Sequence, residues 1–397
     1  MERATVNELA GHLNIPMILG VLFLVGLAAD LIGRYTFLPR VTLLLLAGLS
    51  LGSSGFSILP ELFIETWFPT LTTIALAFIG FLLGQQLSSS ALREHGLKIV
   101  IISVCKVLGA WLAVGLALWL VDAPIVIAAL LAGVAPATDP AATYDQVRET
   151  AAKGEFAETL LAIVGIDDVW GIVIFVAMLA LARLAGAELV SDASILSSLA
   201  DLGKSIALGA ILGAPMAYLT GRVRRGEPTM VEAIGFVLLG AGLAEWFELL
   251  PIVTSMAMGI TVASLASHHD RPFHAIEGIE WPFLVLFFVL AGASLELNAL
   301  SSVAGYTILY VVARCAGIYA GTRIGSIFAN ANSQLKSFLG LALFPQAGVA
   351  IGMALFAAQR FPEYGNVVLT VAVASTIILE TIGPIIARQA IRAAGTT

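Results

Sequence analysis

At residues 133–140 the chain reads Gly133-Val134-Ala135-Pro136-Ala137-Thr138-Asp139-Pro140, inside an otherwise apolar run. The two prolines each lack a backbone N–H and disfavour helix at the residue before them, so a helix that enters this stretch breaks in it. A second apolar run holds Phe344-Pro345-Gln346-Ala347-Gly348, which predicts another break. The backbone groups that a break frees need protein or water as partners, so both stretches indicate a polar site.

The composition around these breaks is that of a membrane protein. Of 397 residues, 59% are hydrophobic and 12% are charged, and the mean hydropathy is +0.97. Soluble globular proteins carry about 25% charged residues. The net charge of -7 excludes a nucleic-acid binder, which needs a basic face. The two cysteines, Cys105 and Cys315, lie in apolar runs and predict neither a disulfide framework nor a thiolate metal site.

A membrane-spanning helix needs about 20 mostly apolar residues, and the sequence divides into about thirteen such segments. They cover residues 15–33, 39–58, 68–88, 98–121, 124–146, 156–184, 194–219, 231–249, 251–266, 281–298, 302–328, 334–358 and 365–390. Most of the 20 Lys and Arg residues fall at alternate ends of these segments, which places the N-terminus outside and the C-terminus in the cytoplasm. The predicted fold class is an all-α polytopic membrane protein.

Two adjacent carboxylates, Asp167 and Asp168, fall near the middle of the apolar run 159–182. Ionisable groups at bilayer depth are costly, so they mark functional sites by default. Neighbouring helical residues point about 100° apart, so one carboxylate can face a water-filled cavity while the other meets a fixed partner. Repulsion and desolvation favour protonation of at least one of them, and the pair therefore predicts a group that exchanges a proton for a cation.

Three further ionisable residues, Lys106, Arg314 and Glu380, lie at depth. An unpaired guanidinium is expensive in a membrane, so an acid is expected near Arg314, and Asp167, Asp168 and Glu380 are the candidates. Glu380 serves either as that partner or as a helix-packing group. Lys106 either belongs to the site or extends its long stem toward the interface.

Interrupted helices in corresponding halves of a chain indicate inverted repeats around a midplane site. The breaks fall in the fifth and twelfth segments, which predicts two crossing broken helices. In that arrangement Asp139 offsets the positive N-terminal ends of the half-helices, and Thr138 presents an oxygen to a cation. Gln346, in the second break, is an accessory candidate together with Glu380.

Several motifs follow one another along the chain: Ala137-Thr138-Asp139-Pro140, Gly165-Ile166-Asp167-Asp168-Val169, Phe287-Phe288-Val289, Gly292-Ala293-Ser294-Leu295 and Arg314-Cys315-Ala316-Gly317. In combination they resemble the bacterial monovalent cation/proton antiporters, of the Na⁺/H⁺ antiporter type with an Asp-Asp motif. The resemblance runs along nearly the whole chain, including residues 38–52 and the Phe344-Pro345-Gln346 break.

This resemblance implies a secondary active transporter rather than an enzyme, without a cofactor. It would exchange Na⁺ (or Li⁺) for H⁺ by an elevator-type alternating-access mechanism in the bacterial inner membrane, surrounded by lipid, and serve pH homeostasis. The implied core ion-transport domain covers residues 98–184 and 302–391. Residues 15–88 and 231–297 would form the dimerisation domain of a homodimer, with 194–219 as the linker helix.

The resemblance also implies roles for the candidate residues. Asp168 would bind the cation and the proton in competition, with Na⁺ held by Asp168 and Thr138, and with Asp167 and Asp139 in the same cation/proton-binding group. Asp167 would pair with Arg314 as its counter-charge. Electrogenic relatives generally carry lysine where Arg314 stands, as a candidate second proton carrier. Arginine stays charged at any accessible pH, so the sequence leaves electrogenic and electroneutral exchange both open.

Other functions fit parts of the pattern. A K⁺/H⁺ antiporter would use the same site, and a sodium-coupled organic anion symporter would share the fold but needs additional polar contacts for its substrate. An intramembrane aspartyl protease would pair Asp145 with Asp167, but Gly165-Ile166-Asp167 departs from the Gly-x-Gly-Asp segment of those enzymes. A channel would have no use for a proton counter-flux.

Overall fold

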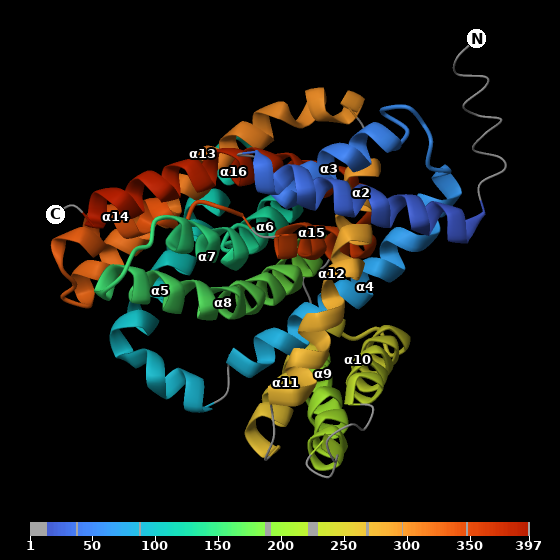
Figure 1. Ribbon diagram of the computed structural model, residues 1–397, viewed down its shortest axis with the longest axis horizontal. Helices are drawn as coiled ribbons and strands as arrows, with labels where there is room; N and C mark the ends of the chain where they lie inside the picture. Colours follow the sequence, from blue (N-terminus) through green and yellow to red (C-terminus); the bar gives the residue numbers. More distant parts are fainter. Residues whose placement is uncertain are drawn as a thin grey trace. The chain divides into compact units, whose positions relative to one another are not determined.

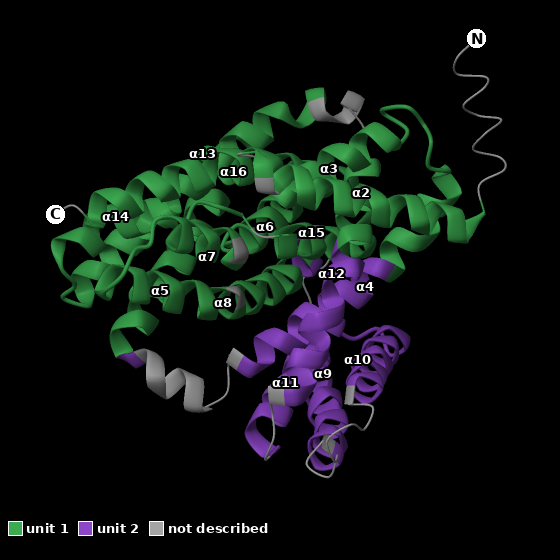
Figure 2. Cartoon of the chain, in the orientation of Figure 1, with its two compact units in different colours: residues 1–70, 97–182, 285–397 green, residues 71–96, 183–284 purple. Residues whose placement is uncertain are grey.

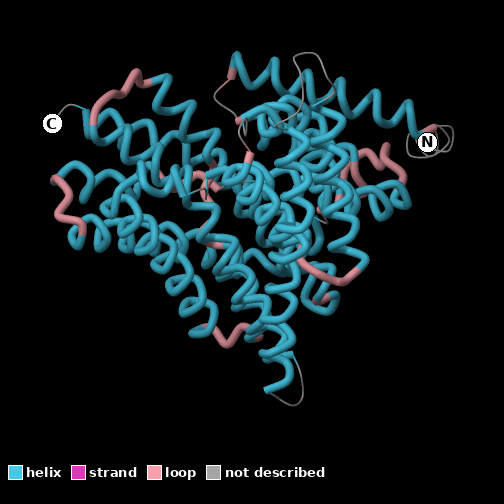
Figure 3. The backbone as a smooth tube through the Cα atoms, turned by 90° about the horizontal axis from the view of Figure 1, so that it is seen from below, coloured by secondary structure: helices cyan, strands magenta, loops and turns pink. Residues whose placement is uncertain are grey.

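The computed structural model describes residues 14–36, 39–86, 89–186, 192–220, 229–266, 270–295, 297–346 and 348–395. Across these residues every regular element is a helix (Figures 1 and 3). The helices are α2 (Ile15–Tyr35), α3 (Arg40–Leu51), α4 (Glu61–Gln86), α5 (Ser89–Leu120), α6 (Ile125–Val134), α7 (Pro140–Glu149), α8 (Glu155–Gly186), α9 (Asp192–Thr220), α10 (Thr229–Trp246), α11 (Pro251–Leu265), α12 (Asp270–Ala293), α13 (Leu297–Phe328), α14 (Ser333–Ala342), α15 (Gly348–Arg360) and α16 (Pro362–Gly395).

The helices confirm the predicted all-α membrane fold. Each predicted segment overlaps a helix, although α3 ends at Leu51 and leaves the rest of the predicted segment 39–58 in turns. The two segments with prolines at mid-depth are each split into a pair, α6 with α7 and α14 with α15. Within the described residues, 8 helices are long and apolar enough to cross a membrane. Shorter apolar helices of 10–17 residues accompany them, among them the half-helices α6 and α15.

Contacts divide the chain into two units (Figure 2). Unit 1 comprises Met1–Thr70, Leu97–Ala182 and Val285–Thr397, and unit 2 comprises Leu71–Gly96 and Arg183–Leu284. Unit 2 contains α9, α10 and α11 around a buried apolar core to which Phe81 and Phe273 contribute stacked rings, with centroids 4.6 Å apart. All candidate site residues belong to unit 1. The predicted division into a transport domain, a dimerisation domain and a linker helix stays a prediction.

Helices α5 and α13 of unit 1 cross in close contact at two glycines. A Cβ atom on Gly109 would collide with the carbonyl oxygen of Gly317, and a Cβ atom on Gly317 would collide with the carbonyl oxygen of Gly109. Such a reciprocal contact is what two repeats related by a two-fold axis produce. Lys106 and Arg314 each stand three residues before these glycines, so the crossing brings a basic side chain from each repeat toward the breaks.

The two breaks lie against each other. Helix α6 ends at Val134 and α7 begins at Pro140, while α14 ends at Ala342 and α15 begins at Gly348. The backbone N–H of Asp139 in the first break donates to the carbonyl oxygen of Pro345 in the second, at 3.3 Å. The prediction of two crossing broken helices is therefore confirmed.

Candidate functional site

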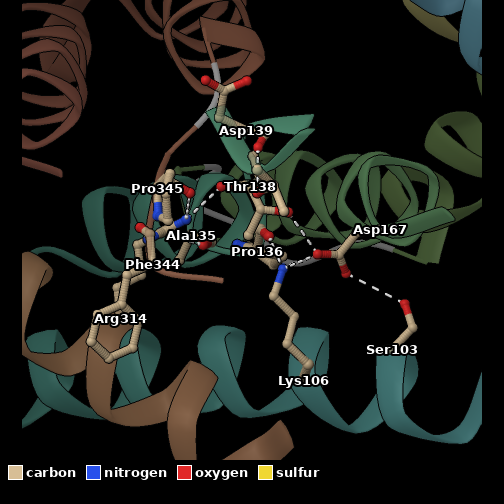
Figure 4. A network of polar contacts seen from close by, with 12 residues as sticks. Ser103, Lys106, Ala135, Pro136, Thr138, Asp139, Asp167, Arg314, Phe344 and Pro345 are labelled. Carbon is tan, nitrogen blue, oxygen red and sulfur yellow. Dashed lines mark hydrogen bonds and ion pairs between the residues drawn. The ribbon is translucent and has the colours of Figure 1, made fainter. Parts of the chain in front are cut away.

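Asp167 on α8 is buried and held by three side chains (Figure 4). The ammonium group of Lys106 on α5 forms an ion pair with its Oδ2 atom, and both side chains are 0% exposed. The hydroxyl of Thr138 donates to the same oxygen at 2.7 Å. The hydroxyl of Ser103 lies 3.4 Å from the other oxygen, Oδ1. The carboxylate of Asp167 is thus neutralised within the protein and tied to the first break.

Lys106 also serves the backbone of the break. Its ammonium donates to the carbonyl oxygen of Pro136 at 2.6 Å, so one group satisfies a freed carbonyl and balances a carboxylate. The sequence left two options for this lysine, and full burial excludes the one in which it reaches the interface. Lys106 belongs to the site.

Arg314 on α13 binds carbonyl oxygens of both breaks (Figure 4). Its Nε atom donates to Ala135 at 2.9 Å and its Nη2 atom to Ala137 at 2.6 Å, in the first break. In the second break Nη1 donates to Phe344 at 2.7 Å, and Nη2 also reaches Pro345 at 3.3 Å. A guanidinium offers five donors in a fixed fork, which suits this set of acceptors.

The expected direct pair between Asp167 and Arg314 is therefore corrected, because Lys106 takes the place beside Asp167. The physical reason is the negative charge, about half an elementary charge each, at the C-terminal ends of α6 and α14. The carbonyls at these ends need donors, and Arg314 supplies them. Its charge acts on Asp167 and Glu380 only from beyond hydrogen-bonding distance.

Thr138 and Asp139 are neighbours in the first break but face different groups. Thr138 points to Asp167, while the Asp139 carboxyl points to the other side of the break (Figure 4). The backbone carbonyl of Asp139 accepts from the N–H of Thr143 at 3.3 Å and from its hydroxyl at 2.9 Å, which anchors the first turn of α7. The structure thus brings Thr138 and Asp167 together and leaves Asp139 apart from them.

Asp168 follows Asp167 on α8, and its side chain lies outside the part of the chain that the structure describes.

A second cluster of polar side chains lies at the second break, around Gln346. The amide of Gln346 donates to the hydroxyl of Thr376 at 3.0 Å and lies 3.5 Å from that of Ser375, both on α16. Glu380, one turn further along α16, is 1% exposed, its oxygens accept no hydrogen bond from Arg314, and its carboxyl lies beside that of Asp139. It is therefore not a direct partner of Arg314, which was one of the two roles that the sequence left open.

Sequence reasoning missed Ser103 and the pairing of Lys106. Ser103 stands three residues before Lys106 and so shares its helix face, but a lone serine in an apolar helix carries no recognisable signal. The pairing of Lys106 did leave a signal in the sequence. Lys106 and Arg314 both stand three residues before a glycine, in the fourth and eleventh segments. These two bases stand at equivalent positions, and both donate hydrogen bonds to backbone carbonyls of the breaks.

Among the described residues, no group of three or more His, Cys, Asp or Glu side chains could hold a metal ion. A cation at this place would need hydroxyl, amide or carbonyl oxygens beside one or two carboxylates. Such mixed oxygen sites suit hard cations.

A membrane-spanning helical fold in which two broken helices cross beside buried, paired charges defines a secondary transporter. The chain belongs to the sodium/hydrogen exchanger family, whose transmembrane-region model matches residues 19–388. It is a cation/proton antiporter and not an enzyme.

Solved structures show the same fold. The sodium proton antiporter MjNhaP1 from Methanocaldococcus jannaschii, at pH 8, is 18% identical, with a TM-score of 0.78 over 100% of this chain and 99% of that one. A second structure of MjNhaP1, from an electron-microscopy map, is 19% identical, with a TM-score of 0.67 over 96% of both chains. A comparison with curated proteins gives no match.

Proposed function

We propose that the chain exchanges Na⁺ (or Li⁺) for H⁺, with the two ions competing at Asp168, by an elevator-type movement of the transport domain. The observation that carries this proposal is the state of Asp167. Its carboxylate is neutralised by Lys106 and hydrogen-bonded by Thr138, so it is a fixed part of the site. To the neighbouring carboxylate, Asp168, we assign the exchange of Na⁺ and H⁺.

Thr138 supports a cation next to these carboxylates. Its hydroxyl hydrogen is directed at Asp167, so the lone pairs of the same oxygen are left for another positive group. We assign Na⁺ to Asp168 and the Thr138 oxygen, with Asp167 in the surrounding shell. Asp139 acts instead at the N-terminal end of α7, where a carboxylate offsets the helix dipole.

One rule couples the two fluxes. A bare carboxylate is penalised by desolvation when the site crosses the membrane, whereas a carboxylate that holds Na⁺ or a proton is neutral and can cross. Because the two ions exclude each other at Asp168, each crossing carries one or the other. Inward movement of one is thereby exchanged for outward movement of the other.

Arg314 limits the coupling ratio. Its guanidinium keeps its proton and is held by carbonyls of both breaks, so it carries no proton across. We propose electroneutral exchange of one ion for the other. We further propose a homodimer in a bacterial inner membrane, with the N-terminus outside, and the domain division given by the resemblance.

The test is proton movement in liposomes that contain the purified protein. Addition of Na⁺ or Li⁺ outside is expected to shift the internal pH, and Asp168→Asn is expected to lower this rate by about a hundredfold or more. A buried ion that loses its neutralising partner is destabilised by about 3 to 5 kcal/mol, which corresponds to that factor. Asp145→Asn, which removes an exposed carboxylate of α7, is the matched control and should keep the wild-type rate.

The same experiment separates the alternatives. A potassium gradient that drives proton movement better than sodium, measured without the valinomycin clamp, would make the protein a K⁺/H⁺ antiporter. No proton movement with any cation would contradict antiport by this chain and favour a sodium-coupled symporter. Acceleration of the Na⁺-driven rate by a valinomycin/K⁺ clamp would show net charge transfer and contradict electroneutral exchange.

A further inference from the structure

Three buried acceptor atoms near the second break make no hydrogen bond. They are both carboxylate oxygens of Glu380 and the side-chain oxygen of Gln346. The two residues are 1% and 0% exposed. A buried acceptor without a partner costs about 1 to 3 kcal/mol, and more if it is charged, so a group of three indicates a bound water or ion.

These atoms belong to one place in unit 1. Thr376 and Glu380 are four residues apart on α16 and share a helix face, and Gln346 is bonded to Thr376. Helix α16 touches the break directly, since a Cβ atom on Gly383 would lie 2.9 Å from the nitrogen of Pro345. The carboxyl of Asp139, from the first break, is close enough to act on that of Glu380.

The charged groups around the crossing of the two breaks can be matched with opposite charges, except for the carboxylate of Glu380. Arg314 balances the C-terminal ends of α6 and α14, which together carry about one negative charge. Asp139 directly precedes the N-terminal end of α7, which carries about half a positive charge. Lys106 and Asp167 balance each other. Among the described carboxylates around the crossing, Glu380 is the one whose oxygens accept no hydrogen bond from a positive side chain.

We propose that Glu380, Gln346 and Asp139 form a second binding site for a monovalent alkali cation, distinct from the site at Asp168. Carboxylate and amide oxygens are the ligands of hard cations, and a cation satisfies all three orphan acceptors at once. The alternative is a proton shared by the neighbouring carboxyls of Glu380 and Asp139, with the hydroxyl of Tyr310 directed at Gln346. That arrangement holds no cation, so equilibrium Na⁺ binding distinguishes it from the proposed site.

Equilibrium binding of ²²Na⁺ to the purified full-length protein in detergent, at alkaline pH, tests this site. Glu380→Gln is expected to halve the amount of Na⁺ bound at saturation. Asp168→Asn is expected to halve it independently, and the double substitution to abolish binding. Glu363→Gln, which changes an exposed acid on the first turn of the same helix, is the matched control and should bind as the wild type does.

The outcomes separate the two sites. Saturation at the wild-type level in Glu380→Gln would overturn the second site, even if Asp168→Asn lost its share and so upheld the first. Unchanged saturation in Asp168→Asn together with a loss in Glu380→Gln would uphold the second site and contradict the first. Should Glu380→Gln fail to fold, Glu380→Asp keeps the charge on a shorter stem and is expected to retain full saturation with at least tenfold weaker affinity. Wild-type affinity in Glu380→Asp would overturn the proposal.

Discussion

Replacement of Arg314 by methionine is expected to destabilise unit 1 by about 3 to 5 kcal/mol. Methionine fills a similar volume but donates no hydrogen bond, so carbonyl groups of Ala135, Ala137 and Phe344 would be left buried without their donor. The two breaks would also lose the group that joins them. The measurement is the apparent melting temperature of the protein in detergent, followed by tryptophan fluorescence.

Arg314→Lys is the matched control for this effect. Lysine keeps the positive charge but has a single ammonium with three donors, so it cannot reach carbonyls of both breaks as the guanidinium fork does. Its melting temperature is expected to fall between those of the wild type and of Arg314→Met. Equal melting temperatures for Arg314→Lys and the wild type would show that charge alone matters and would contradict the assigned hydrogen-bonding role.

Replacement of Lys106 by methionine is expected to destabilise the fold by a similar amount, about 3 to 5 kcal/mol, and to stop transport. The substitution leaves the carboxylate of Asp167 buried at 0% exposure without its counter-charge. It also removes the donor to the Pro136 carbonyl. Melting temperature and Na⁺-driven proton movement in liposomes are both measured.

A double-mutant cycle separates the contribution of the Lys106–Asp167 ion pair from that of the hydrogen bond to Pro136. Asp167→Asn introduced into the Lys106→Met protein removes the uncompensated charge, so the double variant is expected to be more stable than Lys106→Met alone. Ser103→Ala in the same background is the comparison, because it leaves the charge in place. A double variant no more stable than Lys106→Met would contradict a coupled pair of Lys106 and Asp167.

The sequence was sufficient for the helices and for the breaks at Pro136, Pro140 and Pro345, where proline disfavours helix locally. Proline alone does not decide a break, because Pro69, Pro215, Pro282 and Pro384 lie inside continuous helices. The sequence also predicted a functional role for Asp167 and Asp168, because a carboxylate near the middle of the run 159–182 cannot reach the membrane surface by snorkelling.

The partners within the site were beyond the sequence. Asp167 and Lys106 are 61 residues apart, and whether they meet depends on the rotation of α5 and α8 about their axes. The acceptors of Arg314 are backbone carbonyls, which leave no mark in the sequence, so an acid was expected in their place. Asp139 was grouped with Thr138 because the direction of a side chain in a broken helix follows no periodicity.

The central claim is that Na⁺ and H⁺ compete for one carboxylate, and the pH dependence of the Na⁺ KM in liposomes tests it most directly. Competition predicts that KM rises about tenfold for each unit by which pH falls in the acidic range, while the maximal rate at saturating Na⁺ stays constant. A KM that does not change with pH, together with a maximal rate that falls as pH falls, would contradict the claim. The proton would then act at a place other than the cation site.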